Sequence, residues 1–307
     1  MNTGNKNKLI IFAAVLFTVA MVCLPQVTEA GSKSAIIIWA NSIVPVLLPF
    51  FIFSDFIKKT GNLEKLPVRL YPFLVAFLSG YPMGAKATAD LVQERRLPPA
   101  EGRHILSCSL VTGPAFLMGT VGSFLGSTEA AAVVMASHYF GALANGILWS
   151  SPGSQGRTVN PAKSIQPAKF QSRGESGLFQ CFSSAIMSGF RAMAMILAYL
   201  MLFMIGMNLM DAAGIFSLVG SETAVSVLKG MLEMTAGTSM VGACNISLEL
   251  KTVLTAFLVS FGGLSVIGQS VSMAEGRGIG LLDIIKVKLT HGLFAGILAV
   301  IISCFVL

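Results

Sequence analysis

The stretch that decides the fold runs from residue 78 to residue 122 and reads LSGYPMGAKATADLVQERRLPPAEGRHILSCSLVTGPAFLMGTVG. It is apolar at both ends, yet Gly and Pro interrupt it, and it carries Lys86 and Asp90. Proline removes a backbone donor, and a freed backbone polar group is costly in hydrocarbon unless protein or water satisfies it. Broken, polar segments at membrane depth usually line a cavity. We therefore expect this stretch to form half of a binding site.

The composition indicates a protein embedded in a membrane. Hydrophobic residues make up 54% of the chain and charged residues only 11%, whereas a soluble domain carries roughly 25% charged residues. The net charge of +7 comes from basic residues in short loops, which is typical of helix orientation signals and not of nucleic-acid binding. The predicted fold class is an all-α polytopic membrane protein.

The apolar runs predict seven crossings and two re-entrant hairpins, since a helix needs roughly 20 residues to cross the bilayer core. The first run is followed by small residues and resembles a cleaved signal peptide. An uncleaved first helix is favoured, because the rest of the chain is also embedded. The expected crossings are residues 9–24, 35–56, 104–126, 130–149, 192–210, 252–273 and 289–307.

The two halves of the chain share one order of elements: a span, a hairpin, a broken span and a plain span. The hairpins are expected over residues 70–91 and 213–251, with small-residue turns at 79–84 and 235–239. The broken spans are expected to open at 112–114, 262–263 and 268–269. Each of them contains two glycines six residues apart, in GPAFLMG (113–119) and GGLSVIG (262–268).

Each half has an odd number of crossings, so the second half is expected upside down relative to the first. Such an inverted repeat with broken helices is typical of secondary transporters, whose site lies near the midplane. The predicted division is an N-terminal helix and outer loop (1–34), a first repeat (35–150), a flexible cytoplasmic linker (151–177) and a second repeat (178–307). The net basic loops are expected on the cytoplasmic side, which places the N-terminus in the cytoplasm; they are residues 1–8, 57–69, 92–103, 151–177 and 275–288.

The hairpin tips and broken spans are expected to converge on one site. Exposed helix ends offer N–H donors and a partial positive charge, which suit an anion. Lys86 and Glu233 are ionisable groups at depth. Lys86 is expected to contact a substrate carboxylate, with Glu233 as a candidate partner across the repeat interface, and the alternative is that each extends to its own membrane face. Asp90 and Glu233 are the candidates for charge coupling. The expected substrate-binding residues are Ser79, Gly80, Tyr81, Gly84, Lys86, Ser109, Thr112, Gly113, Glu233, Thr235, Thr238, Ser239, Gly263, Ser265 and Gln269.

No catalytic or metal-binding motif stands out: GxSxG, P-loop and HExxH patterns are all missing from the sequence. We therefore expect a protein that is not an enzyme and has no metal or other cofactor. The expected partners are the lipid bilayer and a small organic anion, with no nucleic acid. Whether the chain assembles as a homo-oligomer is left open.

Four motifs resemble the YlbJ-type sporulation integral membrane proteins, which belong to the wider nucleoside-recognition "gate" group. They are WANSIVPVLLPFFIFSD (39–55), SGYPMGAKATADL (79–91), TGPAFLMGTVG (112–122) and GMLEMTAG (230–237). The resemblance implies transport of dipicolinic acid from the mother cell across the outer forespore membrane during sporulation. Leu110 and Val111 depart from the family pattern, which has Asn residues there, and this puts the substrate in question.

The leading functional hypothesis is a multi-pass transporter that moves dipicolinic acid by alternating access. Two alternatives remain at this point. One is a nucleoside or nucleobase transporter of the same architecture. The other is a membrane scaffold for spore assembly that transports nothing.

Overall fold

A computed structural model describes residues 3–60, 67–150, 174–274 and 280–307, and every regular element in these ranges is a helix. This confirms an all-α polytopic membrane protein. In chain order the elements are α1 (Thr3–Cys23), α2 (Pro25–Ile38), η1 (Trp39–Ile43), α3 (Val44–Thr60), α4 (Tyr71–Ser79), α5 (Tyr81–Gln93), α6 (Pro99–Ser109), η3 (Phe116–Val121), α7 (Gly122–Leu125), α8 (Thr128–Leu148), α9 (Gly174–Ala212), η4 (Phe216–Leu218), α10 (Glu222–Leu232), α11 (Met234–Ala243), α12 (Leu248–Phe261), α13 (Gly263–Ala274) and α14 (Leu281–Val306).

Five helical runs of the described residues are long and apolar enough to cross a membrane, so the predicted count of seven is not confirmed. The first predicted crossing is a shorter apolar helix, Lys8–Cys23. The predicted crossing at 104–126 is divided between α6 and the η3–α7 pair. The five long runs are Pro25–Thr60, Thr128–Leu148, Gly177–Ala212, Leu248–Ala274 and Leu281–Val306.

Two predictions of where helices begin and end are wrong, because in both places a helix continues through the predicted boundary. Residues 25–34, expected as an outer loop, belong to α2, which continues through the π turn η1 into α3. In η1 the Val44 N–H donates to Trp39 O, five residues back, directly before Pro45, which has no N–H to give. The helix α9 is continuous over 39 residues, so the predicted crossing at 192–210 is only the second part of a longer helix. The predicted linker lies outside the described residues except for its end, which begins α9.

Both hairpins form, but each bends at a single residue. The first, α4–α5, bends at Gly80, and the second, α10–α11, bends at Glu233. Residues 235–239, predicted as the second turn, are helical. The side chain of Glu233, the residue before the first residue of α11, caps the N-terminus of this helix. The broken span of the second half opens only at 262–263, where both glycines have positive φ, and α13 runs unbroken through the second predicted break.

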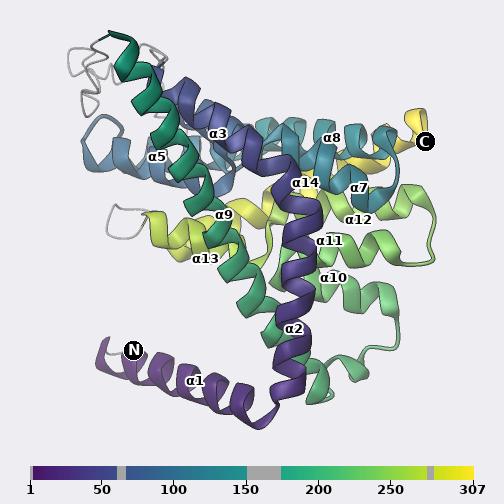
Figure 1. Cartoon of the computed structure of the whole chain (residues 1–307). Coiled ribbons are helices and arrows are strands. Elements are labelled where there is room, and N and C mark those ends of the chain that lie inside the picture. Colours follow the sequence, from purple (N-terminus) through teal and green to yellow (C-terminus); the bar gives the residue numbers. More distant parts are fainter. Residues whose placement is uncertain (1–2, 61–66, 151–173, 275–279) are drawn as a thin grey trace.

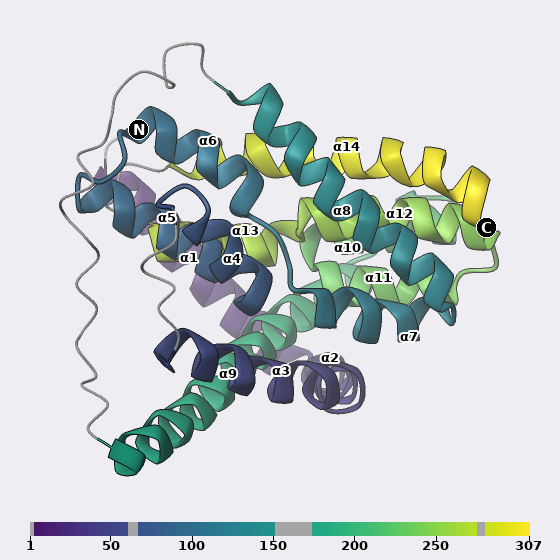
Figure 2. The ribbon, with the colours of Figure 1, turned by 90° about the horizontal axis from the view of Figure 1, so that it is seen from above.

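The helices pack in two groups around the middle of the molecule. The helices α8, α12 and α14 lie side by side, and α9 packs against α2 and α3 (Figure 1). The α4–α5 and α10–α11 hairpins approach the middle from opposite ends, and the two ends of the chain also lie at opposite ends of the molecule (Figure 2). The breaks in the helices are therefore brought to the centre, while the division into two inverted repeats stays a prediction.

Candidate functional site

Chain breaks from both halves of the sequence meet in the middle of the molecule. Gly263 lies against the second hairpin tip, where a Cβ on it would be 3.0 Å from Met234 N. Tyr81, the first residue after the bend of the first hairpin, donates a hydrogen bond from its hydroxyl to Val259 O in the last turn of α12. The predicted convergence of the tips and breaks is thus present in the structure.

A cavity of about 340 Å³ lies at this meeting point, enclosed by the breaks together with η1, α3 and α9. Much of its wall is apolar, with Leu47 and Phe51 of α3 and Met195 of α9 among the lining residues. Seven predicted binding residues line it: Ser79, Gly80, Tyr81, Thr112, Glu233, Thr235 and Gln269.

The other predicted binding residues do not line this cavity, and several have packing or hydrogen-bonding contacts instead. Thr238 donates to Thr235 O at 3.0 Å, and the buried Ser109 hydroxyl lies 3.2 Å from the Thr88 hydroxyl. These contacts satisfy buried polar groups within the helices that carry the site. The residues outside the cavity wall are Gly84, Lys86, Ser109, Gly113, Thr238, Ser239, Gly263 and Ser265.

Lys86 is paired with Asp90, and the expected Lys86–Glu233 pair is therefore not what the structure shows. The Lys86 ammonium lies 2.6 Å from Asp90 Oδ2, one turn along α5, and the two side chains are 42% and 33% exposed. An i,i+4 pair of this kind is a feature of a helix surface and contributes little.

Glu233 has a backbone partner at its own hairpin tip. Its carboxylate accepts a hydrogen bond from Ala236 N at 2.6 Å and caps α11, and Ser265 donates to its other oxygen at 3.4 Å. A buried carboxylate at a helix N-terminus gains from the free N–H groups and the helix dipole. Glu233 thus lines the cavity while it holds the α10–α11 tip in shape.

Arg191 is a cation of the cavity wall that the sequence analysis missed. It lies in the apolar helix α9, is exposed, and has no ion pair or hydrogen bond with the described residues. The signal was available in the sequence, because an Arg inside an otherwise apolar membrane segment is costly and usually functional. Tyr199, two turns further along α9, and Ser272 of α13 are the other polar lining residues not predicted.

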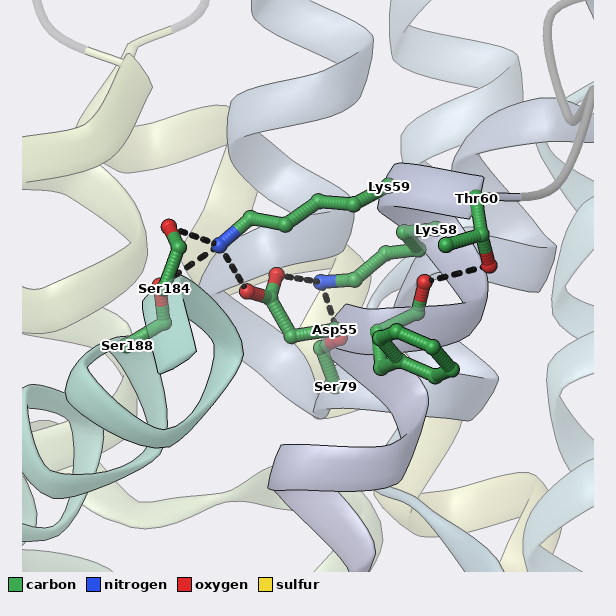
Figure 3. A network of polar contacts seen from close by, with 8 residues as sticks. Asp55, Lys58, Lys59, Thr60, Ser79, Ser184 and Ser188 are labelled. Carbon is green, nitrogen blue, oxygen red and sulfur yellow. Dashed lines mark hydrogen bonds and ion pairs between the residues drawn. The ribbon is translucent and has the colours of Figure 1, made fainter. Parts of the chain in front are cut away.

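A cluster on α3 reaches the cavity through Ser79. Figure 3 shows the Asp55 carboxylate between two lysines: Lys58 Nζ lies 3.3 Å from Asp55 Oδ1, and Lys59 Nζ lies 2.7 Å from Asp55 Oδ2. Lys58 Nζ also donates to the Ser79 hydroxyl at 2.8 Å. The two lysines were predicted to lie in a loop, but they occupy the last turn of α3, where a cation interacts well with the helix dipole.

Lys59 extends the same cluster to α9. Its ammonium donates to Ser184 at 2.7 Å and to Ser188 at 3.3 Å, so the cluster joins α3, the end of α4 and α9 (Figure 3). Ser188 lies one turn before Arg191 on α9. Among the described residues, two lysines and one arginine therefore lie near one end of the cavity, together with the Asp55 carboxylate.

The extended segment between α6 and η3 has its backbone groups satisfied by side chains of α8 and α14. Thr112 N donates to His138 Nε2 at 3.1 Å, and the Tyr139 hydroxyl donates to Thr112 O at 2.9 Å. Lys288 Nζ donates to Leu110 O at 3.1 Å. Non-helical backbone at membrane depth is tolerated only where such partners exist. The structure thus explains how this break is stable.

Lys288 was predicted to lie in a cytoplasmic loop, and that prediction is wrong. The helix α14 already begins at Leu281, and Lys288 is fully buried in it. Lys288 follows several other charged residues in the sequence, and this suggested a loop. Its burial depends on how α14 packs against α6 and α8.

Together the fold and the cavity define a class of protein, a polytopic helical membrane protein with broken helices around a central cavity. Comparison with curated proteins finds similarity to the "Sporulation integral membrane protein YlbJ" of Bacillus subtilis (strain 168). The identity is 24% over 343 aligned positions, which cover 98% of this chain and 84% of that protein. The chain is therefore a homologue of YlbJ, and the match supports the YlbJ-type family that the motifs predicted. No family model and no solved structure matches the chain.

Proposed function

We propose that this protein is a sporulation membrane transporter that moves a small organic anion, dipicolinic acid, by alternating access. The relative's name supports the sporulation role, since that protein is described as a sporulation integral membrane protein. The membrane proposed is the outer forespore membrane, with the N-terminus in the cytoplasm.

The observation that carries the proposal is the Arg191 guanidinium, which has no partner among the described residues and lies on the wall of a largely apolar cavity. An arginine presents a planar fork that matches a carboxylate in two parallel hydrogen bonds. Dipicolinate is a flat aromatic ring with two carboxylates, so its faces suit the apolar wall and its charges suit the cations. The hydroxyls of Ser79, Thr112 and Tyr199 add donors around the same space.

The breaks around the cavity support movement of the substrate through it. Secondary transporters commonly bind substrate at discontinuous helices and expose it to each side in turn by rocking one part against the other. Here the α4–α5 and α10–α11 tips, approaching from opposite ends, are the elements that would open the cavity to one side or the other (Figure 2).

The test is uptake of labelled dipicolinate into liposomes that contain the purified protein. Removing a hydrogen bond to a charged group costs about 1.5–3 kcal/mol, so Arg191→Gln is expected to weaken binding roughly 10- to 100-fold. The affinity of Arg191→Lys for dipicolinate is expected to lie between those of the natural protein and Arg191→Gln. Lys86→Gln is the matched control and should transport normally, since Lys86 lies outside the cavity wall.

Two outcomes would contradict the proposal. If labelled nucleosides enter the liposomes and labelled dipicolinate does not, the protein is a nucleoside transporter. If no solute crosses and spores without the gene hold normal dipicolinate, the scaffold hypothesis is correct.

A further inference from the structure

The side-chain nitrogen of Lys288 is buried in the middle of the molecule and has no acidic partner among the described residues. The residue is 0% exposed. Its Nζ has one hydrogen bond, to Leu110 O at 3.1 Å, and lies 4.1 Å from the centroid of the Tyr81 ring. No carboxylate of the described residues lies within ion-pair distance of it.

The titratable groups around Lys288 come from three helices and are tied up in hydrogen bonds. Tyr81 of α5 donates to a backbone oxygen. His138 of α8 accepts the Thr112 N–H at Nε2, so its remaining proton lies on Nδ1, 2.8 Å from the Ser260 hydroxyl, and the ring is neutral.

His291, on the same helix as Lys288, is held in a similar way. Its Nε2 lies 2.8 Å from His138 O and donates to it, and its ring lies tilted against that of His138, with the ring centroids 4.7 Å apart. With both histidines and the tyrosine engaged, Lys288 is the group of this cluster whose charge is free to change.

Lys288 is connected to the cavity through two contacts. Tyr81 lines the cavity, and its ring also packs against Lys288 Nζ. Leu110, which accepts the hydrogen bond, begins the extended segment that carries the cavity-lining Thr112. An anion in the cavity would therefore lie close to Lys288, with low-dielectric protein between the two charges.

An unpaired charge in such surroundings is unfavourable, and the neutral amine is the cheaper form when the cavity is empty. A nearby anion reverses the preference, because the attraction between opposite charges is strong at low dielectric. The linkage is reciprocal: if the anion favours the proton on Lys288, the proton favours the anion by the same factor.

We propose that Lys288 binds a proton when the organic anion enters the cavity and releases it when the anion leaves, so that anion and proton cross the membrane together. The inference rests on the proposed function. The step adds one proton to the neutral amine from the side on which the anion enters and returns it on the other side. Movement of the α4–α5 tip, which carries Tyr81, would uncover Lys288 to each side in turn.

The first experiment measures proton binding directly. The protein in weakly buffered detergent solution is mixed with dipicolinate, and a pH dye reports proton uptake. One proton per bound anion is expected for the natural protein and none for Lys288→Met. Binding without proton uptake would overturn this inference and leave the proposed function standing. If dipicolinate neither binds nor crosses the membrane, the proposed function itself is wrong.

The second experiment uses liposomes with the membrane potential clamped. A proton gradient of one pH unit should raise dipicolinate accumulation by up to about tenfold for one coupled proton. Lys288→Arg keeps a donor for Leu110 O and a permanent charge, so it should bind the anion and lose the response to the gradient. Lys86→Arg is the matched control and should respond like the natural protein. A gradient response retained in Lys288→Arg would contradict the proposal, even if Lys288→Met fails to fold.

Discussion

The two hairpin tips share a closely packed glycine and differ in the chemistry of the bend. In each, a glycine four residues beyond the bend lies in very close contact with its neighbours. A Cβ on Gly84 would be 2.1 Å from Ser109 O, and a Cβ on Gly237 would be 1.9 Å from Gly230 Cα. The small residues in both tips therefore serve close helix contact more than the turn itself.

The bend residues differ. Gly80 has φ +81° and ψ −177°, a conformation that essentially only glycine adopts, and it offers no side chain. Glu233 has ordinary extended backbone and caps α11 with its carboxylate. A bend between two short helices can thus be made by a permissive residue or by a capping residue, with different backbone angles, and only the capping residue adds an ionisable group to the cavity wall.

The largest effect is expected where the glycine contact is tightest. Gly237→Ala should lower the free energy of unfolding by about 3 kcal/mol or more, because the backbone of α10 must move. Gly84→Ala should cost nearly as much. Thermal unfolding in detergent measures both. Gly268→Ala is the control: nothing lies within 4 Å of its Cβ position in α13, so it should be neutral or stabilising by about 0.5–1 kcal/mol. Equal stability of all three variants would refute the shared packing.

A smaller effect is expected at the first bend. Gly80→Ala meets no atom within 4 Å, so its cost is backbone strain alone, about 1–3 kcal/mol. The same thermal unfolding assay checks it. If Gly80→Ala is as stable as the natural protein, the bend does not depend on a left-handed glycine and the contrast between the tips disappears.

The second bend should respond to loss of its cap. Glu233→Ala removes the acceptor for Ala236 N and is expected to cost about 0.5–2 kcal/mol. Glu233→Asp keeps a carboxylate and, as a good N-cap residue, should recover part of the loss. Unfolding of the two variants side by side tests this, and an equal loss in both would show that the carboxylate is not acting as a cap.

The smallest effect is expected for the charged pairs on the hairpin arms. Lys86→Ala breaks an exposed pair and should cost less than about 1 kcal/mol. Lys229→Ala should cost more, since Lys229 is 13% exposed, lies 2.5 Å from Asp211 Oδ2 and lies over the Phe216 ring. A larger loss for Lys86→Ala in unfolding experiments would contradict this order.

Much of the architecture followed from local signals. The bend at Gly80 and the break at 262–263 were predicted because glycine weakens a helix wherever it occurs. The turn predicted at 235–239 was wrong for the same reason, since small residues there pack against α10 instead of bending. Whether a glycine bends a helix or lets two helices touch depends on what lies beside it.

The candidate site was predicted only in part, because local sequence shows where a helix breaks but not which side chains from other helices lie beside the break. Hydroxyls next to breaks, such as Ser79 and Thr112, could be found because the breaks place them. Lys86 was singled out because it was predicted to lie deep in the membrane, but it forms an ion pair with Asp90, one turn away on α5. Arg191 could have been found from its apolar surroundings, whereas its place on the cavity wall could not.

The sequence by itself determined that the chain lies in a membrane, that its helices are broken and that the breaks carry polar groups, because composition and backbone preference are local properties. Only the tertiary structure decided which cation faces the cavity and which is buried. Lys288 and Arg191 acquire their surroundings from helices distant in the chain: α5, α6 and α8 for the first, and the breaks with α3 for the second. Those contacts determine whether a charged side chain is buried or paired, and they cannot be predicted from the sequence around the residue because they come from distant parts of the chain.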